Sequence, residues 1–76
     1  MFNSKSKKAK LEMNGIFNEI QINLENNYKD LAIDARKRAE VTLSRLKSEN
    51  QLSDRDYEKL KVKLDDFTRR MEGYHH

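Results

Sequence analysis

The sequence predicts an all-α fold, on three observations. Proline is absent and only two glycines occur, Gly15 and Gly73, so little interrupts a helix over the 76 residues. Apolar residues recur every three or four positions through most of the chain, which is the period of one helix face. Helix start and stop signals flank the last of these periodic segments. A chain of this length has room for one small domain.

The composition indicates that one chain alone forms a domain of low stability. Only 36% of the residues are hydrophobic and 38% are charged, so a core built by one chain is marginal. Small domains of this kind usually gain stability from disulfides, a metal or association. Cysteine is absent, which excludes disulfides and thiolate zinc sites. We therefore expect self-association, most simply as a homodimer.

Residues 1–10 are predicted to form a flexible basic arm ahead of a single domain of residues 11–76. All of the net positive charge of the chain comes from this arm, because the remainder is slightly negative. Such an arm is a candidate contact for phosphate groups of a nucleic acid or for an anionic membrane surface. Its basic residues are Lys5, Lys7, Lys8 and Lys10.

Residues 11–48 are predicted to form one long helix. The apolar phase continues without a change across the Asn26-Asn27 dipeptide, which favours a continuous helix there. The alternative is a break at these asparagines, with Asn26 in a left-handed position and Asn27 capping a new helix. A break would give a monomeric three-helix bundle.

A turn over residues 49–53 and a second helix over residues 54–72 complete the predicted hairpin. Ser53 is a good N-cap, with Asp56 three residues later as in a capping box, and Leu52 and Tyr57 stand at the positions of a hydrophobic staple. Gly73 stands where a left-handed residue ends many helices. The predicted hairpin core consists of Leu31, Ala35, Leu46, Tyr57, Leu60, Leu64, Phe67 and Met71.

The two predicted helices differ in length, and this suggests an interface. A helix of about 40 residues is about 60 Å long, whereas residues 54–72 span only about 28 Å. The shorter helix covers the longer one only from about Leu31 to Leu46. The apolar stripe before that stretch would be left in water, which predicts an antiparallel hairpin that dimerises into a four-helix bundle. The predicted self-association interface is Met13, Phe17, Ile20 and Leu24.

Residues 43–64 resemble the short bacterial helical-hairpin module known as SHOCT. Leu43 and Leu46 precede Asn50, and then come Leu52-Ser53 and an acidic-aromatic segment ending at Lys61 and Leu64. Asn50 replaces the usual glycine of that module, and a single Leu64 replaces its leucine pair. The resemblance covers under a third of the chain, and it implies oligomerisation or docking rather than catalysis.

No pattern in the sequence indicates catalysis, a cofactor or a metal site. The only histidines are His75 and His76 at the chain end, where metal ligands lack rigid support. Acidic residues fall beside lysine or arginine on the expected helices, and no phosphate-binding glycine loop or nucleophile with an internal histidine occurs. We therefore predict a protein that is not an enzyme.

The function predicted from the sequence is a helical protein–protein interaction or oligomerisation module, acting as an adaptor or regulator. The alternative is a nucleic-acid-associated accessory protein that uses the lysine arm. No signal peptide or membrane-spanning stretch is recognisable, so a cytoplasmic location is the expectation.

Overall fold

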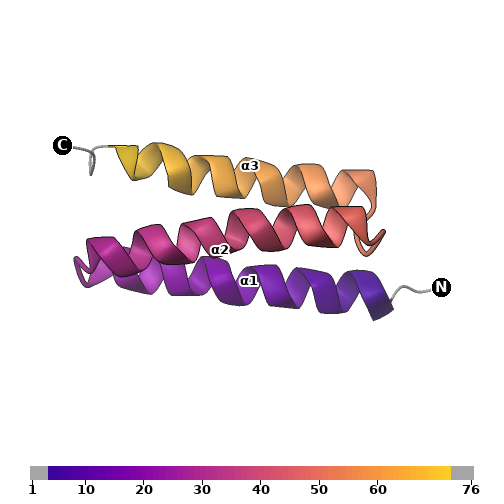
Figure 1. Cartoon of the computed structure of the whole chain (residues 1–76), viewed down its shortest axis with the longest axis horizontal. Coiled ribbons are helices and arrows are strands. Elements are labelled where there is room, and N and C mark those ends of the chain that lie inside the picture. Colours follow the sequence, from indigo (N-terminus) through magenta and orange to yellow (C-terminus); the bar gives the residue numbers. More distant parts are fainter. Residues whose placement is uncertain (1–3, 73–76) are drawn as a thin grey trace.

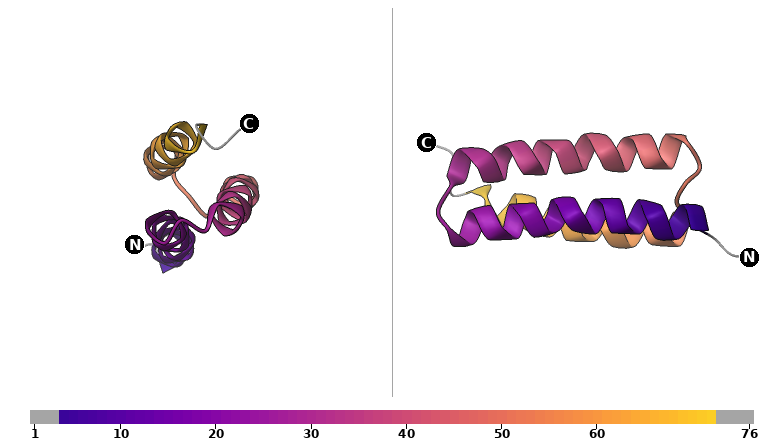
Figure 2. Two further views of the ribbon diagram at one scale, coloured as in Figure 1. Left: turned by 90° about the vertical axis from the view of Figure 1, so that its left-hand side faces the viewer. Right: turned by 90° about the horizontal axis from the view of Figure 1, so that it is seen from below.

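The computed structural model describes residues 4–72, with side chains from residue 6, and contains three α-helices in this range. They are α1 (Ser4–Glu25), α2 (Lys29–Ser48) and α3 (Asp54–Arg70), each antiparallel to the next (Figure 1). Seen end-on, the helices occupy the corners of a triangle (Figure 2). The prediction of an all-α fold is confirmed for these residues.

The long helix predicted for residues 11–48 is wrong, because the chain reverses after Glu25. Asn27 has a φ of 64°, in the left-handed region that asparagine tolerates better than most residues. The amide of Tyr28 donates to the carbonyl of Asn23 at 2.8 Å, and that of Asn27 donates to Leu24 at 3.1 Å. These two bonds form a Schellman motif, which satisfies carbonyls at the end of α1. The alternative prediction of a break at Asn26-Asn27 is the one that the helix bounds support.

The left-handed residue lies one position later than the alternative placed it. Asn27 takes this role instead of Asn26, and Tyr28 precedes α2 without a side-chain capping bond. The end of α2 repeats the same motif: Asn50 has a φ of 58°, and the amide of Gln51 donates to the carbonyl of Leu46 at 2.9 Å. Both reversals of the chain therefore use an asparagine where glycine is more common.

The N-cap of α3 agrees with the sequence prediction, whereas the Asp56 carboxylate accepts a hydrogen bond from Ser6. The Ser53 hydroxyl accepts a hydrogen bond from the amide of Asp56 at 3.1 Å, so Ser53 is the N-cap. Leu52 is buried and Tyr57 packs against the core as a half-buried residue, as expected for a staple. The predicted role of Gly73 lies outside the described residues.

The predicted flexible arm is wrong for residues 4–10, which belong to α1. Ser6 and Ala9 are buried and extend the apolar stripe of α1 towards its start. Lysine and alanine are also good helix formers, so the lysine content of this segment does not oppose a helix. The remainder of the arm, residues 1–3, lies outside the described residues.

The stripe predicted as a dimer interface is buried by the chain itself. Met13, Phe17 and Ile20 are at most 2% exposed, and Leu24 is partly buried. The ring centroids of Phe17 and Phe67 are 5.7 Å apart, so α3 packs directly on this stripe. Once the chain reverses after Glu25, the exposure that called for a second copy at this stripe is gone. We refer to Met13, Phe17, Ile20 and Leu24 as the inner stripe.

The predicted hairpin core is mostly correct, with one error at Leu31. Leu31 is 52% exposed, and the neighbouring Ala32 is fully buried in its place. The buried side of α2 therefore differs from the predicted one at the start of the helix, whereas Ala35 and Leu46 keep their predicted places, and the adjacent apolar residues hid this local difference in the sequence. The other predicted core residues are buried, or half-buried in the case of Tyr57: Ala35, Leu46, Tyr57, Leu60, Leu64, Phe67 and Met71.

The left-handed turn gives a first prediction. Replacing Asn27 with alanine should destabilise the bundle by about 1 kcal/mol, because a Cβ without a local polar group is disfavoured at positive φ. Asn27→Gly should be neutral or stabilising at the same site. Urea unfolding followed by circular dichroism measures both. Equal stability of the two variants would contradict the turn geometry.

Two isoleucines in α1 form a matched pair for a second prediction. Ile20 is fully buried, whereas Ile22 is 46% exposed. Ile20→Ala should lower the free energy of unfolding by about 2 to 5 kcal/mol, whereas Ile22→Ala should change it by about 0.5 kcal/mol or less at low protein concentration. Thermal unfolding distinguishes them, and a reversed order would exclude this arrangement of α1.

Candidate interaction surface

The helices are held in register by ion pairs across each contact. Arg38 and Arg45 of α2 pair with Glu19 and Glu12 of α1, the second pair at 2.8 Å. Lys47 pairs with Asp54 at 2.5 Å between α2 and α3. These pairs are exposed and contribute little stability individually, but their charges are compensated within the chain.

Asp56 lies at the junction of α1 and α3. Its carboxylate accepts a hydrogen bond from the Ser6 hydroxyl at 3.0 Å and lies 3.5 Å from the Lys10 ammonium. The Ser6 hydrogen bond and the Lys10 charge lower the pKa of Asp56, and a contribution from Ser53 acts in the same direction. This cluster fastens the start of α1 to the start of α3.

The other resolved pKa shifts arise from ion pairs of the same kind. The hydrogen bond with Lys47 lowers the pKa of Asp54, and the same bond raises the pKa of Lys47. A hydrogen bond with Glu19 raises the pKa of Arg38. Each shift favours the charge that the group already carries at neutral pH. This is the effect of a structural ion pair, and it does not prepare a group for proton transfer.

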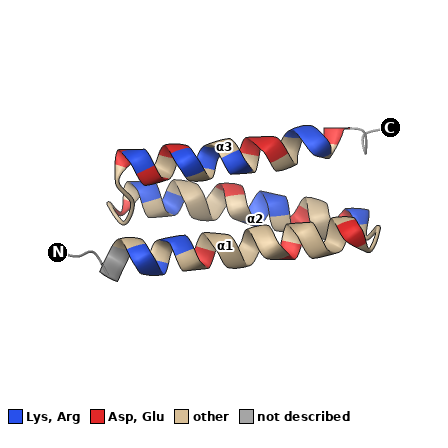
Figure 3. Ribbon diagram, turned by 180° about the vertical axis from the view of Figure 1, so that it is seen from behind, with Lys and Arg blue, Asp and Glu red and all other residues tan. Residues whose placement is uncertain are grey.

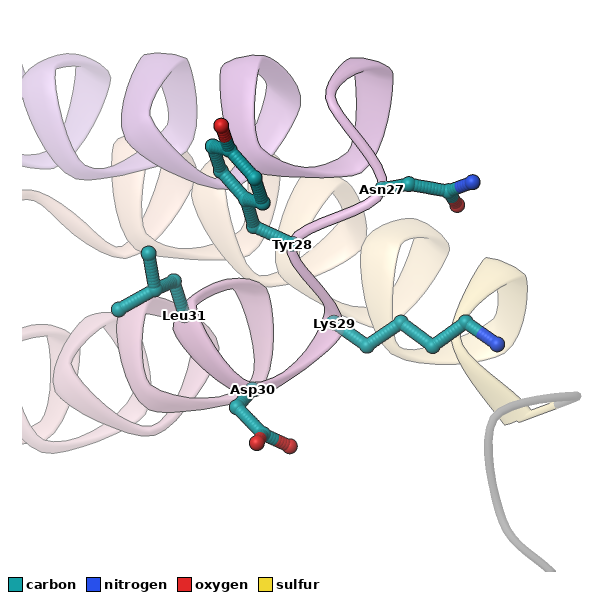
Figure 4. Close-up of a pocket in the computed structure, with 5 residues that line it drawn as sticks. All are labelled: Asn27, Tyr28, Lys29, Asp30 and Leu31. Carbon is teal, nitrogen blue, oxygen red and sulfur yellow. The ribbon is translucent and has the colours of Figure 1, made fainter.

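Shallow hollows occur at three places on the described part of the bundle, and none of them gathers reactive groups; the smallest of the three, of about 370 Å³, lies between α2 and α3. The first, of about 460 Å³, lies at the turn between α1 and α2 and is lined by residues 27–31. Figure 4 shows Tyr28 and Leu31 projecting to one side of this turn, while Asn27, Lys29 and Asp30 point elsewhere. The second, of about 420 Å³, lies between α1 and α3. Its lining residues are Asn14, Phe17, Asn18, Gln21, Lys63, Phe67 and Arg70.

The predicted anion-contact lysines do not form one face. At about 100° of rotation per residue, the positions of Lys5, Lys7, Lys8 and Lys10 are distributed around α1. Lys7 and Lys8 are exposed, Lys10 pairs with Asp56, and the side chain of Lys5 lies outside the described ones. Lysines in the first turns also oppose the helix dipole, since the amino-terminal end carries partial positive charge.

The outer side of α1 carries a second periodic set of residues, which we call the outer seam. All its members are exposed, and they are spaced three and four residues apart in alternation, as in a heptad seam. The outer seam consists of Lys8, Leu11, Gly15, Asn18, Ile22 and Glu25.

The outer seam lies on nearly the opposite side of α1 from the inner stripe, as the helical rotation requires. Leu11 is 63% exposed and Ile22 is 46% exposed. A Cβ built on Gly15 would meet nothing within 4 Å, so this side of the helix is open. This seam was not predicted from the sequence, because the inner stripe of the same helix is more hydrophobic and gives the stronger periodic pattern.

Charge also distinguishes this side of α1 from the rest of the molecule. Between residues 13 and 24, Glu19 is the single charged residue, and it pairs with Arg38. Figure 3 shows uncharged residues over most of the second half of α1, whereas charged residues follow at short intervals along α3. A charge-poor helix face with exposed aliphatic groups is typical of protein interfaces.

Comparison with protein-family models, curated protein sequences and solved structures finds no significant match for this chain. The resemblance of residues 43–64 to the SHOCT module therefore stays a prediction. Those residues span the end of α2, the second turn and the first part of α3.

The described part of the chain has neither a membrane-spanning helix nor a cluster of metal-ligating side chains. None of the helices there is long and apolar enough to cross a membrane. Within residues 4–72, histidine, aspartate and glutamate side chains form no group of three that would hold a metal ion.

The Asp56 cluster gives a third prediction. The folded-state pKa of Asp56 lies below its ordinary value of 3.8. The Asp56 carboxylate therefore contributes to the stability of the folded protein above pH 3.8, and this contribution is lost as pH falls through the folded-state pKa. Asp56→Asn should therefore destabilise the protein at neutral pH and reduce the loss of stability below about pH 4. Ser6→Ala should also lower the stability at neutral pH and reduce the loss of stability in acid, since it removes the hydroxyl donor but keeps the carboxylate. Thermal unfolding over a pH series measures these effects. A pH profile of Asp56→Asn parallel to that of the original protein would contradict the assignment.

Proposed function

We propose that this chain is a non-enzymatic helical interaction module, which acts as an adaptor or an oligomerisation unit. The observation that carries the proposal is the outer seam of α1. Leu11, Gly15 and Ile22 occupy an exposed and charge-poor side of a helix. Another helix is the most natural partner for such a face, because a heptad spacing matches the surface of a second helix.

The arrangement of polar groups supports an interaction role over a catalytic one. The carboxylates with resolved pKa shifts, Asp54 and Asp56, are both stabilised in the charged form by partners of the same chain. General acid–base catalysis uses groups whose pKa is moved towards the working pH, which is the opposite effect for a carboxylate. The shallow hollows also lack the convergent polar groups of a substrate site.

The dimer predicted from the sequence stays part of the proposal, but with a different surface. The inner stripe fills the core of the chain's own bundle, so association through it would require the bundle to open. The outer seam is available without any rearrangement. The resemblance to the SHOCT module implies the same class of function, oligomerisation or docking.

The alternative function, nucleic-acid association, has weaker support. Phosphate binding gains from several cations on one face. Lys10 is already paired with Asp56, and the lysine positions at the start of α1 are distributed around the helix instead of along one face.

A photo-crosslinking experiment tests the interaction role. A photoreactive residue in place of Asn18 lies on the outer seam, whereas the same residue in place of Val62, which is 64% exposed on α3, is the matched control. In cells expressing the protein, irradiation should give a discrete adduct from position 18 and not from position 62. The mass of the adduct reports whether the partner is a second copy or another protein. No adduct from position 18, or the same adduct from both positions, would contradict the proposal.

A further inference from the structure

We propose that the outer seam binds the outer seam of a second copy of this chain, antiparallel and about a two-fold axis that passes between Ile16 and Phe17. This inference rests on the proposed interaction role and names the partner. It differs from the dimer predicted from the sequence, because each chain keeps its inner stripe buried in its own bundle. The product is a pair of three-helix bundles joined through α1.

The order of residues along the seam is the first argument. Antiparallel pairing about this axis sets Leu11 against Ile22 of the other copy, so the two aliphatic positions meet. By symmetry this contact occurs twice. Aliphatic contacts of this kind are what a helix seam buries. A parallel pairing would instead set each residue against its own copy.

Charge complementarity is the second argument. The same register sets Lys8 against Glu25 of the other copy, at both ends of the seam. Both residues are exposed, and neither forms an ion pair with another described residue; the Glu25 carboxylate accepts one neutral hydrogen bond, from the Gln21 amide, and keeps its charge uncompensated. Parallel pairing would place like charges together at both ends, which is unfavourable.

The middle of the seam is the third argument. Gly15 faces Asn18 of the other copy in this register, on both sides of the axis. The open space at Gly15 lets the two helix backbones approach closely. A single polar residue within a seam is a known means of fixing its register. Gly15 and Asn18 together therefore favour one alignment.

The residues that flank the seam are compatible with this pairing. On one side lie the amides of Asn14 and Gln21, which are polar groups able to hydrogen-bond at an interface; the Gln21 Nε2 already donates to the Glu25 carboxylate of its own chain at 2.9 Å. On the other side lie Glu12 and Glu19, whose charges would repel in the dimer if they were free. Each of them is already paired with an arginine of α2.

Two aliphatic side chains per copy form a small interface. We expect a dissociation constant on the order of 10 to 100 μM, as in weak and reversible complexes. Analytical ultracentrifugation between about 10 μM and 1 mM covers this range. Leu11→Glu should give a monomer that keeps the circular dichroism of the original protein, because Leu11 is exposed in the bundle.

Charge reversal tests the register. Lys8→Glu and Glu25→Lys should each raise the dissociation constant about tenfold, since each creates two like-charge contacts. The double variant restores opposite charges and should return to within about threefold of the original value. Lys37→Glu, on an exposed position of α2, is the matched control and should have little effect.

Disulfide capture tests the direction of pairing. Because the chain has no native cysteine, only the introduced thiols are able to form disulfides. A mixture of Leu11→Cys and Ile22→Cys chains should form the mixed disulfide on mild oxidation. The same position in the two copies is separated by 11 residues of helix, or about 16 Å, so 11–11 and 22–22 disulfides should be minor. Val62→Cys mixed with Leu11→Cys is the control.

Several outcomes would overturn the inference. They are a monomer at every concentration, a preference for 11–11 or 22–22 disulfides, and a double charge variant whose dissociation constant is as high as those of the single variants. A monomer that still gives a position-18 adduct of another mass in cells would remove the second copy but leave the interaction role. If the protein is a monomer and no position-18 adduct forms in cells, both the second copy as partner and the interaction role are excluded.

Discussion

The fold depends on how the inner stripe of α1 is removed from water. Met13, Phe17, Ile20 and Leu46 are the largest of the side chains that the described part of the chain buries completely, so their burial is a main source of the hydrophobic stabilisation. A single hairpin of residues 11–72 cannot supply this burial, since its second helix is too short. The chain solves this by reversing after Glu25, which lets both α2 and α3 pack against α1. The burial of the inner stripe within one chain follows from that reversal.

The sequence was sufficient for the fold class, the last helix and its cap, because these depend on local signals. Ser53 caps α3 through a bond to a residue three positions away, and such contacts follow from spacing alone. The break at Asn27 was harder to predict, since a left-handed asparagine and a helical asparagine look the same in the sequence. Apolar periodicity argued for continuity. It failed because Leu31 and Ala32 are adjacent, so the apolar pattern continues whichever of the two is the buried residue after the turn.

The candidate surface was predicted less well than the fold, for a related reason. The sequence pattern predicts an interface on the helix that carries the outer seam, but it places this interface on the more hydrophobic stripe of that helix. In the structure that stripe is the core, and the weaker periodicity of Leu11, Gly15 and Ile22 stays exposed. Apolar content alone does not tell an interface from a core in a chain whose number of helices is uncertain. Once the number is three, the side of α1 that remains outside follows from helix geometry.

The two sides of α1 also differ in a way that suits their separate roles. The inner stripe carries large side chains and an aromatic stack between Phe17 and Phe67, which favour permanent burial. The outer seam carries a glycine, an amide and only two aliphatic residues, so it remains compatible with water in an isolated bundle. A stronger outer seam would compete with the inner stripe for the core, since rotating α1 by half a turn would exchange them. The modest hydrophobicity of the outer seam therefore protects the fold, and it limits any association through this face to a weak and reversible one.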